Sequence, residues 1–131
     1  MIEPGIGTEK YKIGSSFNEL GINLDNVFEI EDREILRVYK TKEIWFFINA
    51  NTEKLDQLSL FNPFNEKVLG KIGIGDPLYK VHELFGQCVI NHSVHEPKST
   101  FGIAFETEKG SKSKNVKIES ISVSEPFAFY G

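Results

Sequence analysis

Three histidines and one cysteine, His82, Cys88, His92 and His95, lie close together in the sequence. Side chains of these types bind Zn²⁺ when four of them converge tetrahedrally. On a strand, His92 and His95 would point to opposite faces. His82 falls on a predicted helix, away from its apolar stripe, and the chain has no second cysteine. The pattern therefore favours surface histidines and a small buried thiol over a metal site.

The sequence also lacks a recognisable catalytic motif. Cys88 follows a predicted helix C-terminus, where the helix dipole disfavours the thiolate that a nucleophile needs. Neither Gly-x-Ser-x-Gly nor His-Glu-x-x-His occurs. The Gly-Ile-Gly triplets at residues 5–7 and 73–75 are too short to be phosphate-binding loops. We therefore expect no catalytic residue, no cofactor and no metal, and a chain that is not an enzyme.

Acidic residues are concentrated in the first half of the chain. Residues 1–65 hold eleven acidic and seven basic residues, whereas residues 66–131 hold eight of each. Much of the excess lies in Asp25 and in a group that only Arg33 opposes locally, namely Glu29, Glu31, Asp32 and Glu34. Such charges either protect an exposed strand from aggregation or form a patch that steers a basic partner.

An aromatic segment follows this acidic group. On a strand, Ile44, Phe46 and Ile48 would share one face, and Trp45 and Phe47 the other. Either the strand is central and covered on both sides, or the second face is exposed and its two rings anchor a protein interface. The candidate partner-binding residues are therefore Glu29, Glu31, Asp32, Glu34, Glu43, Trp45 and Phe47.

Length and composition indicate one globular domain. The 131 residues are 40% hydrophobic and 26% charged, which is ordinary for a soluble protein. A pI near 5.4 argues against nucleic-acid binding, which needs a basic surface. We see no membrane-spanning stretch and no signal peptide, and a single cysteine excludes an intrachain disulfide. These features predict a cytoplasmic protein with neither nucleic acid nor membrane as partner.

The chain contains two similar segments. Residues 54–64 read Lys-Leu-Asp-Gln-Leu-Ser-Leu-Phe-Asn-Pro-Phe, and residues 117–127 read Lys-Ile-Glu-Ser-Ile-Ser-Val-Ser-Glu-Pro-Phe, with four of eleven positions identical at an offset of 63. A second match aligns residues 13–20 with residues 74–81 at an offset of 61. Two matches in the same order indicate a tandem duplication, with residues 1–65 as the first unit and residues 66–131 as the second. Units of this size bury little core alone, so the two should pack together.

Each unit is predicted to begin with a helix. Ser16 and Glu19 form a capping-box pattern, and Gly21 ends the first helix. Asp76 is expected to cap the second helix, which Gly86 ends. Its apolar stripe comprises Leu78, Val81, Leu84 and Phe85. Strands are predicted over residues 27–30, 35–39, 44–48, 55–61, 88–91, 100–107 and 116–123. The predicted fold is α+β: two tandem helix-plus-antiparallel-meander units, packed into one domain with a curved antiparallel sheet.

The start of each unit, Ile-Gly-x-x-hydrophobic-x-x-Leu/Val, ahead of a helix and a meander, resembles the SmpA/BamE-like unit. That unit occurs in tandem in β-lactamase-inhibitor-type proteins. Gly14-Ser15-Ser16 and Gly75-Asp76-Pro77 stand where those families carry Gly-Met-Ser/Thr. The resemblance implies a curved sheet whose concave face holds another protein.

In size, acidity and composition, the chain is also similar to bacterial immunity proteins. We therefore expect a non-enzymatic inhibitor, monomeric or weakly dimeric, that neutralises a basic protein toxin by blocking its active site. Two alternatives remain: an envelope-assembly or scaffolding module of the SmpA/BamE type, and a small-ligand binder in a cleft between the units.

Overall fold

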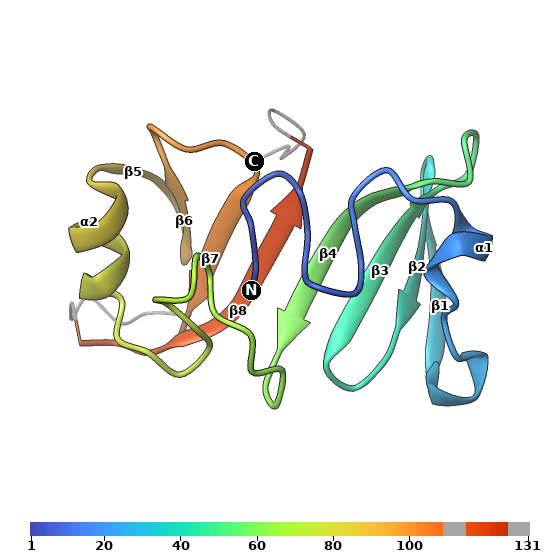
Figure 1. Cartoon of the computed structure of the whole chain (residues 1–131), viewed down its shortest axis with the longest axis horizontal. Helices are drawn as coiled ribbons and strands as arrows, with labels where there is room; N and C mark the ends of the chain where they lie inside the picture. The colour runs from blue at the N-terminus through green and yellow to red at the C-terminus, as the bar shows by residue number, and fades with distance from the viewer. Residues whose placement is uncertain (109–114, 126–131) are drawn as a thin grey trace.

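The fold is dominated by one antiparallel sheet of eight strands, in the order β1-β2-β3-β4-β8-β7-β6-β5 (Figure 1). This computed structural model describes residues 1–108 and 115–125. The end of the second repeat segment, at Pro126 and Phe127, therefore lies outside the described residues. The strands are β1 (Glu29–Arg33), β2 (Leu36–Lys40), β3 (Ile44–Asn49), β4 (Leu55–Phe61), β5 (Cys88–Asn91), β6 (Val94–Pro97), β7 (Ile103–Thr107) and β8 (Ile118–Ser124).

The predicted α+β fold class is wrong, because the helices are too short to form a layer. α1 (Phe17–Leu20) has four residues and α2 (Tyr79–Phe85) has seven, and the only other helical turn in the described residues is 3₁₀, at Leu24–Asn26. Gly21 ends α1 in the left-handed conformation, with φ 59°. The fold is therefore largely β.

The helix starts agree with the sequence in one half only. The capping box at Ser16 and Glu19 is confirmed, since each side chain accepts a hydrogen bond from the other's backbone N–H. Asp76 does not cap α2, because its carboxylate accepts from Gly73 N at 2.8 Å. The helix begins only after Leu78, without a side-chain cap.

One strand was absent from the sequence prediction. β6 was not expected, because Val94–Pro97 mixes charge, histidine and proline and lacks a β-type composition. The strand expected over residues 100–107 begins only at Ile103. Pro97 fits the sheet because neither neighbouring strand needs its missing N–H group. Towards β5 it occupies a non-hydrogen-bonded position opposite Cys88, as the adjacent Lys98 N to Gln87 O bond of 2.9 Å indicates, and the described β6–β7 pairing includes only Val94 and His95 of β6.

The two halves of the sheet meet where β4 pairs with β8. Ser59 lies opposite Ser122, Leu58 opposite Val123, and Leu60 opposite Ile121. An approximate two-fold axis between the two serines relates these pairs to one another. The sequence offset of 63 carries Ser59 to Ser122 and Leu58 to Ile121, so the pair of Leu58 and Val123 corresponds to the pair of Ile121 and Leu60. The halves therefore share one continuous ladder, and the unit boundary at residue 65 stays a prediction.

Each half also repeats the same backbone contact between its first loop and its last strand. Gly14 N donates to Leu55 O and Gly75 N donates to Ile118 O, both at 2.8 Å. The two glycines have φ of 88° and 90°, values that side chains disfavour. The loops thereby place α1 and α2 over equivalent parts of the sheet.

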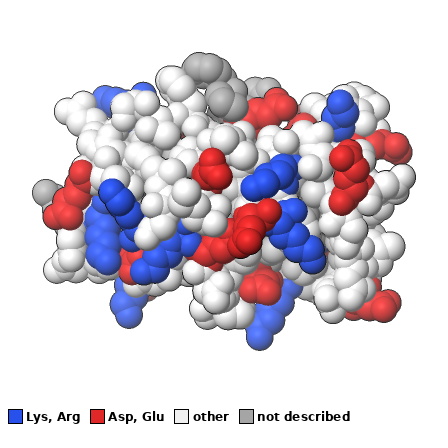
Figure 2. Space-filling view, viewed as in Figure 1, with Lys and Arg blue, Asp and Glu red and all other residues white. Residues whose placement is uncertain are grey.

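Apolar side chains on one face of the sheet form the core, and we call this side the core face. The loops at residues 1–22 and 62–78 and both helices cover it, passing in front of the sheet in Figure 1. Its fully buried members include Phe46, Leu58, Phe105 and Ile121. Figure 2 shows this covered side, on which both basic and acidic side chains occur.

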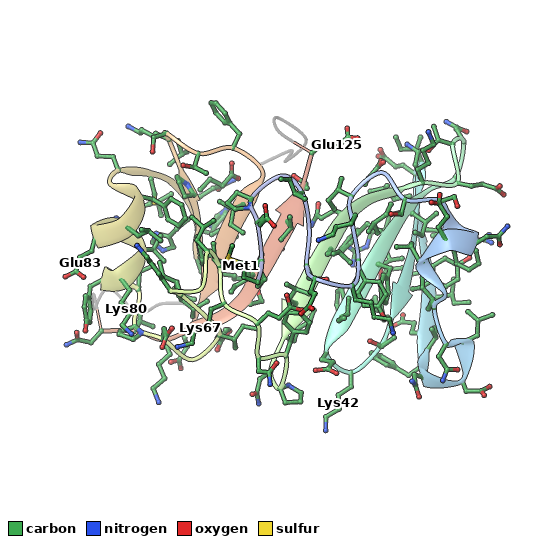
Figure 3. The ribbon with its side chains drawn as sticks, in the orientation of Figure 1. Met1, Lys42, Lys67, Lys80, Glu83 and Glu125 are labelled. Carbon is green, nitrogen blue, oxygen red and sulfur yellow. The ribbon has the colours of Figure 1, made fainter. Side chains whose placement is uncertain are left out.

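The first residues of the chain contact the second half. This N-terminal strap (residues 1–7) bridges Ile2 to Val68, and Ile2 N donates to Lys67 O at 3.0 Å. Gly5 N donates to Gly102 O at 3.1 Å. Figure 3 shows Met1 lying near Lys67, while Lys80 and Glu83 point away from the sheet. The strap thus closes the core over the junction of the halves.

The helices in the described part of the chain are all too short or too polar to cross a membrane.

Candidate protein-binding face

The other face of the sheet, which we call the far face, carries a different set of side chains. The strand registers place on it Glu29, Glu31, Arg33, Leu36, Val38, Lys40, Trp45, Phe47, Gln57, Ser59, Phe61, Val89, Asn91, Val94, Glu96, Ala104, Glu106, Ser120, Ser122 and Ser124. Aromatic and charged side chains occupy the first half, and serines occupy the middle. The face therefore divides into regions of different chemistry.

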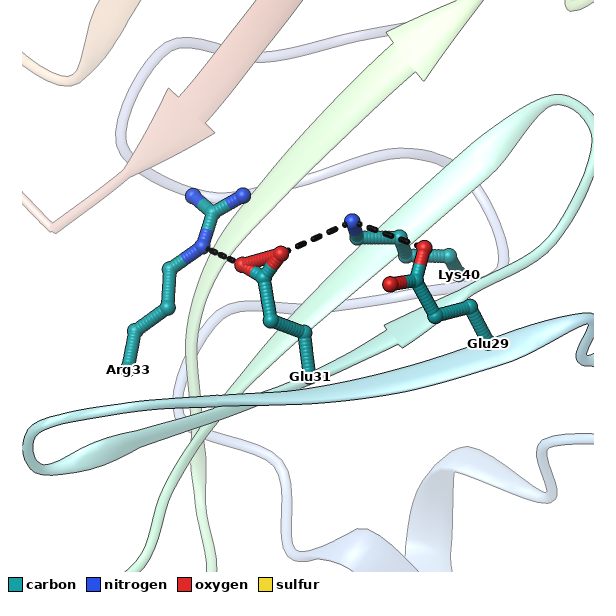
Figure 4. Close-up of polar contacts among 4 residues, drawn as sticks. All are labelled: Glu29, Glu31, Arg33 and Lys40. Atoms are coloured by element: carbon teal, nitrogen blue, oxygen red, sulfur yellow. Dashed lines mark hydrogen bonds and ion pairs between the residues drawn. The ribbon is translucent and has the colours of Figure 1, made fainter.

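A network of four charged side chains lies at the β1–β2 end of the far face (Figure 4). Lys40 Nζ lies 3.2 Å from Glu29 Oε1 and 3.1 Å from Glu31 Oε1. Arg33 Nε pairs with the other carboxylate oxygen of Glu31. Lys40 is only 6% exposed, and its burial is tolerated because two carboxylates accept from its ammonium group.

The network lowers the pKa of Glu31 to about 2, chiefly through the hydrogen bond from Arg33 and next through that from Lys40. The hydrogen bond to Glu31 raises the pKa of Lys40 above its ordinary value, against the opposing effect of burial. Both groups are therefore held in their charged forms across neutral pH.

Cations cover the aromatic rings of this region. Lys40 Nζ lies 4.3 Å from the centre of the Trp45 ring, and Arg33 Cζ lies 5.7 Å from that of Phe47. Phe47 is buried and Trp45 half-buried. The ring of Phe61 lies 5.0 Å from that of Trp45. Within residues 1–108 and 115–125, Trp45 and Phe61 are therefore the aromatic side chains that stay partly accessible on the far face.

Four of the seven predicted partner-binding residues come together here: Glu29, Glu31, Trp45 and Phe47. Asp32 points to the core side, where Arg37 Nε lies 2.8 Å from its carboxylate. Glu34 occupies the β1–β2 turn with φ 50°, and Glu43 lies in the β2–β3 turn. The structure does not place these three with the others.

The sequence analysis missed Lys40, Phe61 and the serines. Lys40 was not recognised as a partner of Glu29, because the two are eleven residues apart and meet only through the hairpin register. Locating the hairpin turn at residues 34–35 would have revealed this partnership, since the position of the turn determines which residues of β1 and β2 lie opposite each other. The acidic group is thus largely neutralised by its own hairpin.

Small polar side chains line the middle of the far face. The hydroxyls of Ser59 and Ser122 are 3.0 Å apart across the β4–β8 junction. Gln57 Nε2 donates to Ser59 Oγ at 3.4 Å, and Ser120 Oγ donates to Glu106 at 3.3 Å. We call Gln57, Ser59, Ser120, Ser122 and Ser124 the serine strip. Ser59, Ser120 and Ser124 are buried, whereas Gln57 and Ser122 are half-buried and are the members of the strip that remain partly accessible.

The charges of the far face differ from those expected. In the first half, Glu29 and Glu31 are matched by Arg33 and Lys40. In the second half, the described strands β5 to β8 place two carboxylates, Glu96 and Glu106, on this face and no lysine or arginine, while Lys98 follows β6 directly in the same alternation. Among the described residues, the far-face carboxylates without an ion pair therefore lie beyond the serine strip.

The stability of this network should depend on pH. Because the folded-state pKa of Glu31 lies near 2 and its ordinary value is 4.5, its stabilising charge is fully present above pH 4.5. That contribution is lost as the pH falls toward 2. We expect Glu31→Gln to show a smaller fall in unfolding free energy than the wild type over this window, measured by urea titration. Glu53→Gln, in the β3–β4 turn, should keep the wild-type slope, and identical slopes for E31Q and wild type would contradict the prediction.

The histidines and the cysteine are arranged differently from the prediction. His82 does not point away: its ring lies 5.9 Å from that of His95, which is buried with no hydrogen-bond partner at Nδ1. Burial, and next the nearby His82, lower the pKa of His95. His92 lies in the β5–β6 turn, and burial raises the pKa of the Cys88 thiol. The described residues contain no group of three or more potential metal ligands.

A pocket of about 520 Å³ lies on the core side, between α1 and the β2–β3 end of the sheet. Arg37, Tyr39 and Phe17 line it together with polar residues of the β3–β4 turn. Arg37 is already paired with Asp32, which also raises its pKa. The guanidinium group is therefore not held ready for an anionic ligand.

No protein-family model, curated protein or solved structure matches this chain.

Proposed function

We propose that the chain is a non-enzymatic, immunity-type inhibitor that binds a protein toxin through the far face and thereby blocks the toxin's active site. The observation that carries the proposal is the composition of this face. It combines two partly accessible aromatic rings, Trp45 and Phe61, with the two half-buried members of the serine strip, Gln57 and Ser122. Rings beside small hydroxyl side chains suit the contact surface of a protein, because they give buried area and adaptable hydrogen bonding together.

The charge pattern favours a basic partner that lies across both halves. At the first-half end, Lys40 and Arg33 are already satisfied by Glu29 and Glu31. These two cations therefore hold the aromatic rings in place and contribute little electrostatic potential at the surface. At the second-half end, Glu96 and Glu106 would attract a cationic segment. A partner oriented in this way would place its central loop over Ser59 and Ser122.

A substitution in the serine strip should abolish this binding. Ser122 is half-buried at the centre of the far face, so Ser122→Arg would raise a long side chain in the path of the partner. We expect the affinity for a toxin captured with the wild-type chain to fall at least about a hundredfold, because a central interface position is obstructed. Isothermal titration calorimetry or surface plasmon resonance would measure it.

The control variant makes the same charge change at a position away from the far face. Asn51→Arg adds the same charge in the exposed β3–β4 turn and should leave the affinity unchanged. Co-expression extends the test: cells that produce the toxin should grow with the wild type or N51R and die with S122R. The proposal fails if the captured protein is not toxic, or if S122R, folded as judged by circular dichroism, protects as well as the wild type.

A further inference from the structure

The sheet ends in two edge strands of different character. Among the described residues, β1 pairs only with β2, and β5 pairs only with β6. Each edge strand exposes an isoleucine: Ile30 is 54% exposed and Ile90 is 58% exposed. β1 carries four charged side chains, whereas β5, with Cys88, Val89, Ile90 and Asn91, carries none. Only β1 has the charges by which natural sheets prevent edge-to-edge pairing.

The charges of β1 act against its own copy in particular. An antiparallel β1–β1 pair centred on Glu31 would place two Glu31 carboxylates side by side, which is destabilising. It would also compete with the ion pairs that Lys40 and Arg33 already make. β5 has no such conflict, and Val89 adds a second apolar side chain that is 54% exposed.

The backbone of β5 is oriented to accept another strand. Lys98 N donates to Gln87 O at 2.9 Å, so Gln87 directs its polar groups to the β6 side. Bonded residues alternate along an antiparallel ladder, so Val89 and Asn91 do the same. The N–H and C=O groups of Cys88 and Ile90 consequently point to the outer edge.

We propose that β5 pairs with β5 of a second copy of this chain, antiparallel and about a two-fold axis at Val89. This register uses the whole extended segment 87–91. Cys88 lies opposite Ile90 of the other copy, and these are the two residues whose backbone groups face outward. Val89 lies opposite Val89 in a non-hydrogen-bonded pair, where side chains come closest. The pairing continues both the core face and the far face from one copy to the other.

The molecule already contains a joint of this kind. β4 and β8 pair antiparallel about an approximate two-fold axis, with Ser59 opposite Ser122 and the core side chains kept on one face. The proposed β5–β5 pair repeats that arrangement between molecules. A closed two-fold dimer also satisfies the exposed edge without leading to open-ended assembly.

Analytical ultracentrifugation over a concentration series tests the proposal with a matched pair of variants. Ile90→Lys should raise the dimer dissociation constant at least about tenfold, because it brings two cations to the joint. Ile30→Lys makes the same change at an equally exposed edge position and should leave the constant unchanged. A wild type that stays monomeric throughout the series, or equal effects of I90K and I30K, would overturn the proposal.

The register has its own test. In a Cys88→Ser background, Val89→Cys should form an intermolecular disulfide under mild oxidation, since the two Cβ atoms would be close enough for one. Ile30→Cys in the same background should not. A wild-type dimer without cross-linking of V89C would exclude this joint in favour of another surface. Because β5 lies at the opposite end of the sheet from Trp45, failure of the dimer leaves the toxin-binding proposal intact.

Discussion

Replacing Phe105 by alanine should lower the unfolding free energy by about 3–5 kcal/mol, as large-to-small changes in a packed core do. Phe105 is fully buried, and its ring lies 5.9 Å from that of Phe85 on α2. A domain of this size has only about 5–15 kcal/mol of stability in total. The variant should therefore unfold at a far lower urea concentration than the wild type. Phe105→Leu, which leaves a smaller cavity, should cost clearly less.

Phe46→Ala is the matched variant in the other half. Phe46 lies opposite Leu58 and Phe105 lies opposite Ile121, which are equivalent positions in the two halves. Phe46 is 2% exposed and contacts Tyr11 edge-on, with ring centres 4.9 Å apart. Because β4 and β8 form one ladder, we expect each variant to shift a single unfolding transition, followed by fluorescence and circular dichroism. Two separate transitions, with only one of them moved by F105A, would contradict this expectation.

Replacing Gly102 by alanine should have the second largest effect. A Cβ atom at this position would lie 2.5 Å from Gly5 Cα and 2.7 Å from Ser124 O, and φ is 84°. Both neighbours are backbone atoms that cannot turn aside, so the N-terminal strap would have to move off the sheet. We expect a loss of about 2–4 kcal/mol, the sum of conformational strain and overpacking.

Gly86→Ala separates these two causes. Gly86 has a similar φ of 79°, but a Cβ atom there would meet nothing within 4 Å. It should therefore cost only the conformational strain, about 1–3 kcal/mol, because φ 79° with ψ −140° is a combination that side chains rarely adopt. Urea denaturation of both variants gives the comparison, and hydrogen exchange at Ile2 and Gly5 reports whether the strap is released. Equal losses for G102A and G86A would show that the close packing of Gly5 on Gly102 contributes nothing.

Local signals in the sequence predicted several elements correctly. The capping box at Ser16 formed, and Gly21 and Gly86 ended their helices. The alternation of Ile44, Phe46 and Ile48 marked a strand with a buried face, and all three are buried. Each of these outcomes depends on residues within a few positions of one another, so the sequence alone was sufficient.

The errors have a common physical origin in contacts between distant residues. The fold class was wrong because the pattern of Leu78, Val81, Leu84 and Phe85 indicates a helix but not how much of the fold helices make up. Lys40 was missed as a partner of the acidic group, since it becomes a neighbour of Glu29 and Glu31 only after β1 pairs with β2. Strand β6 has no apolar alternation of its own and exists because β5 and β7 lie on either side of it.

The N-terminal strap has a consequence for the order of events during synthesis. Ile2 and Gly5 leave the ribosome well before their partners Lys67 and Gly102. At about 5–20 residues per second, Gly102 is made roughly 5–20 s after Gly5. The hairpins of β1 to β4 need only about 1–10 μs each to form. The first half of the sheet can therefore form before the strap has its partners, so the strap reaches its final position later than the strands β1 to β4 that follow it in the chain.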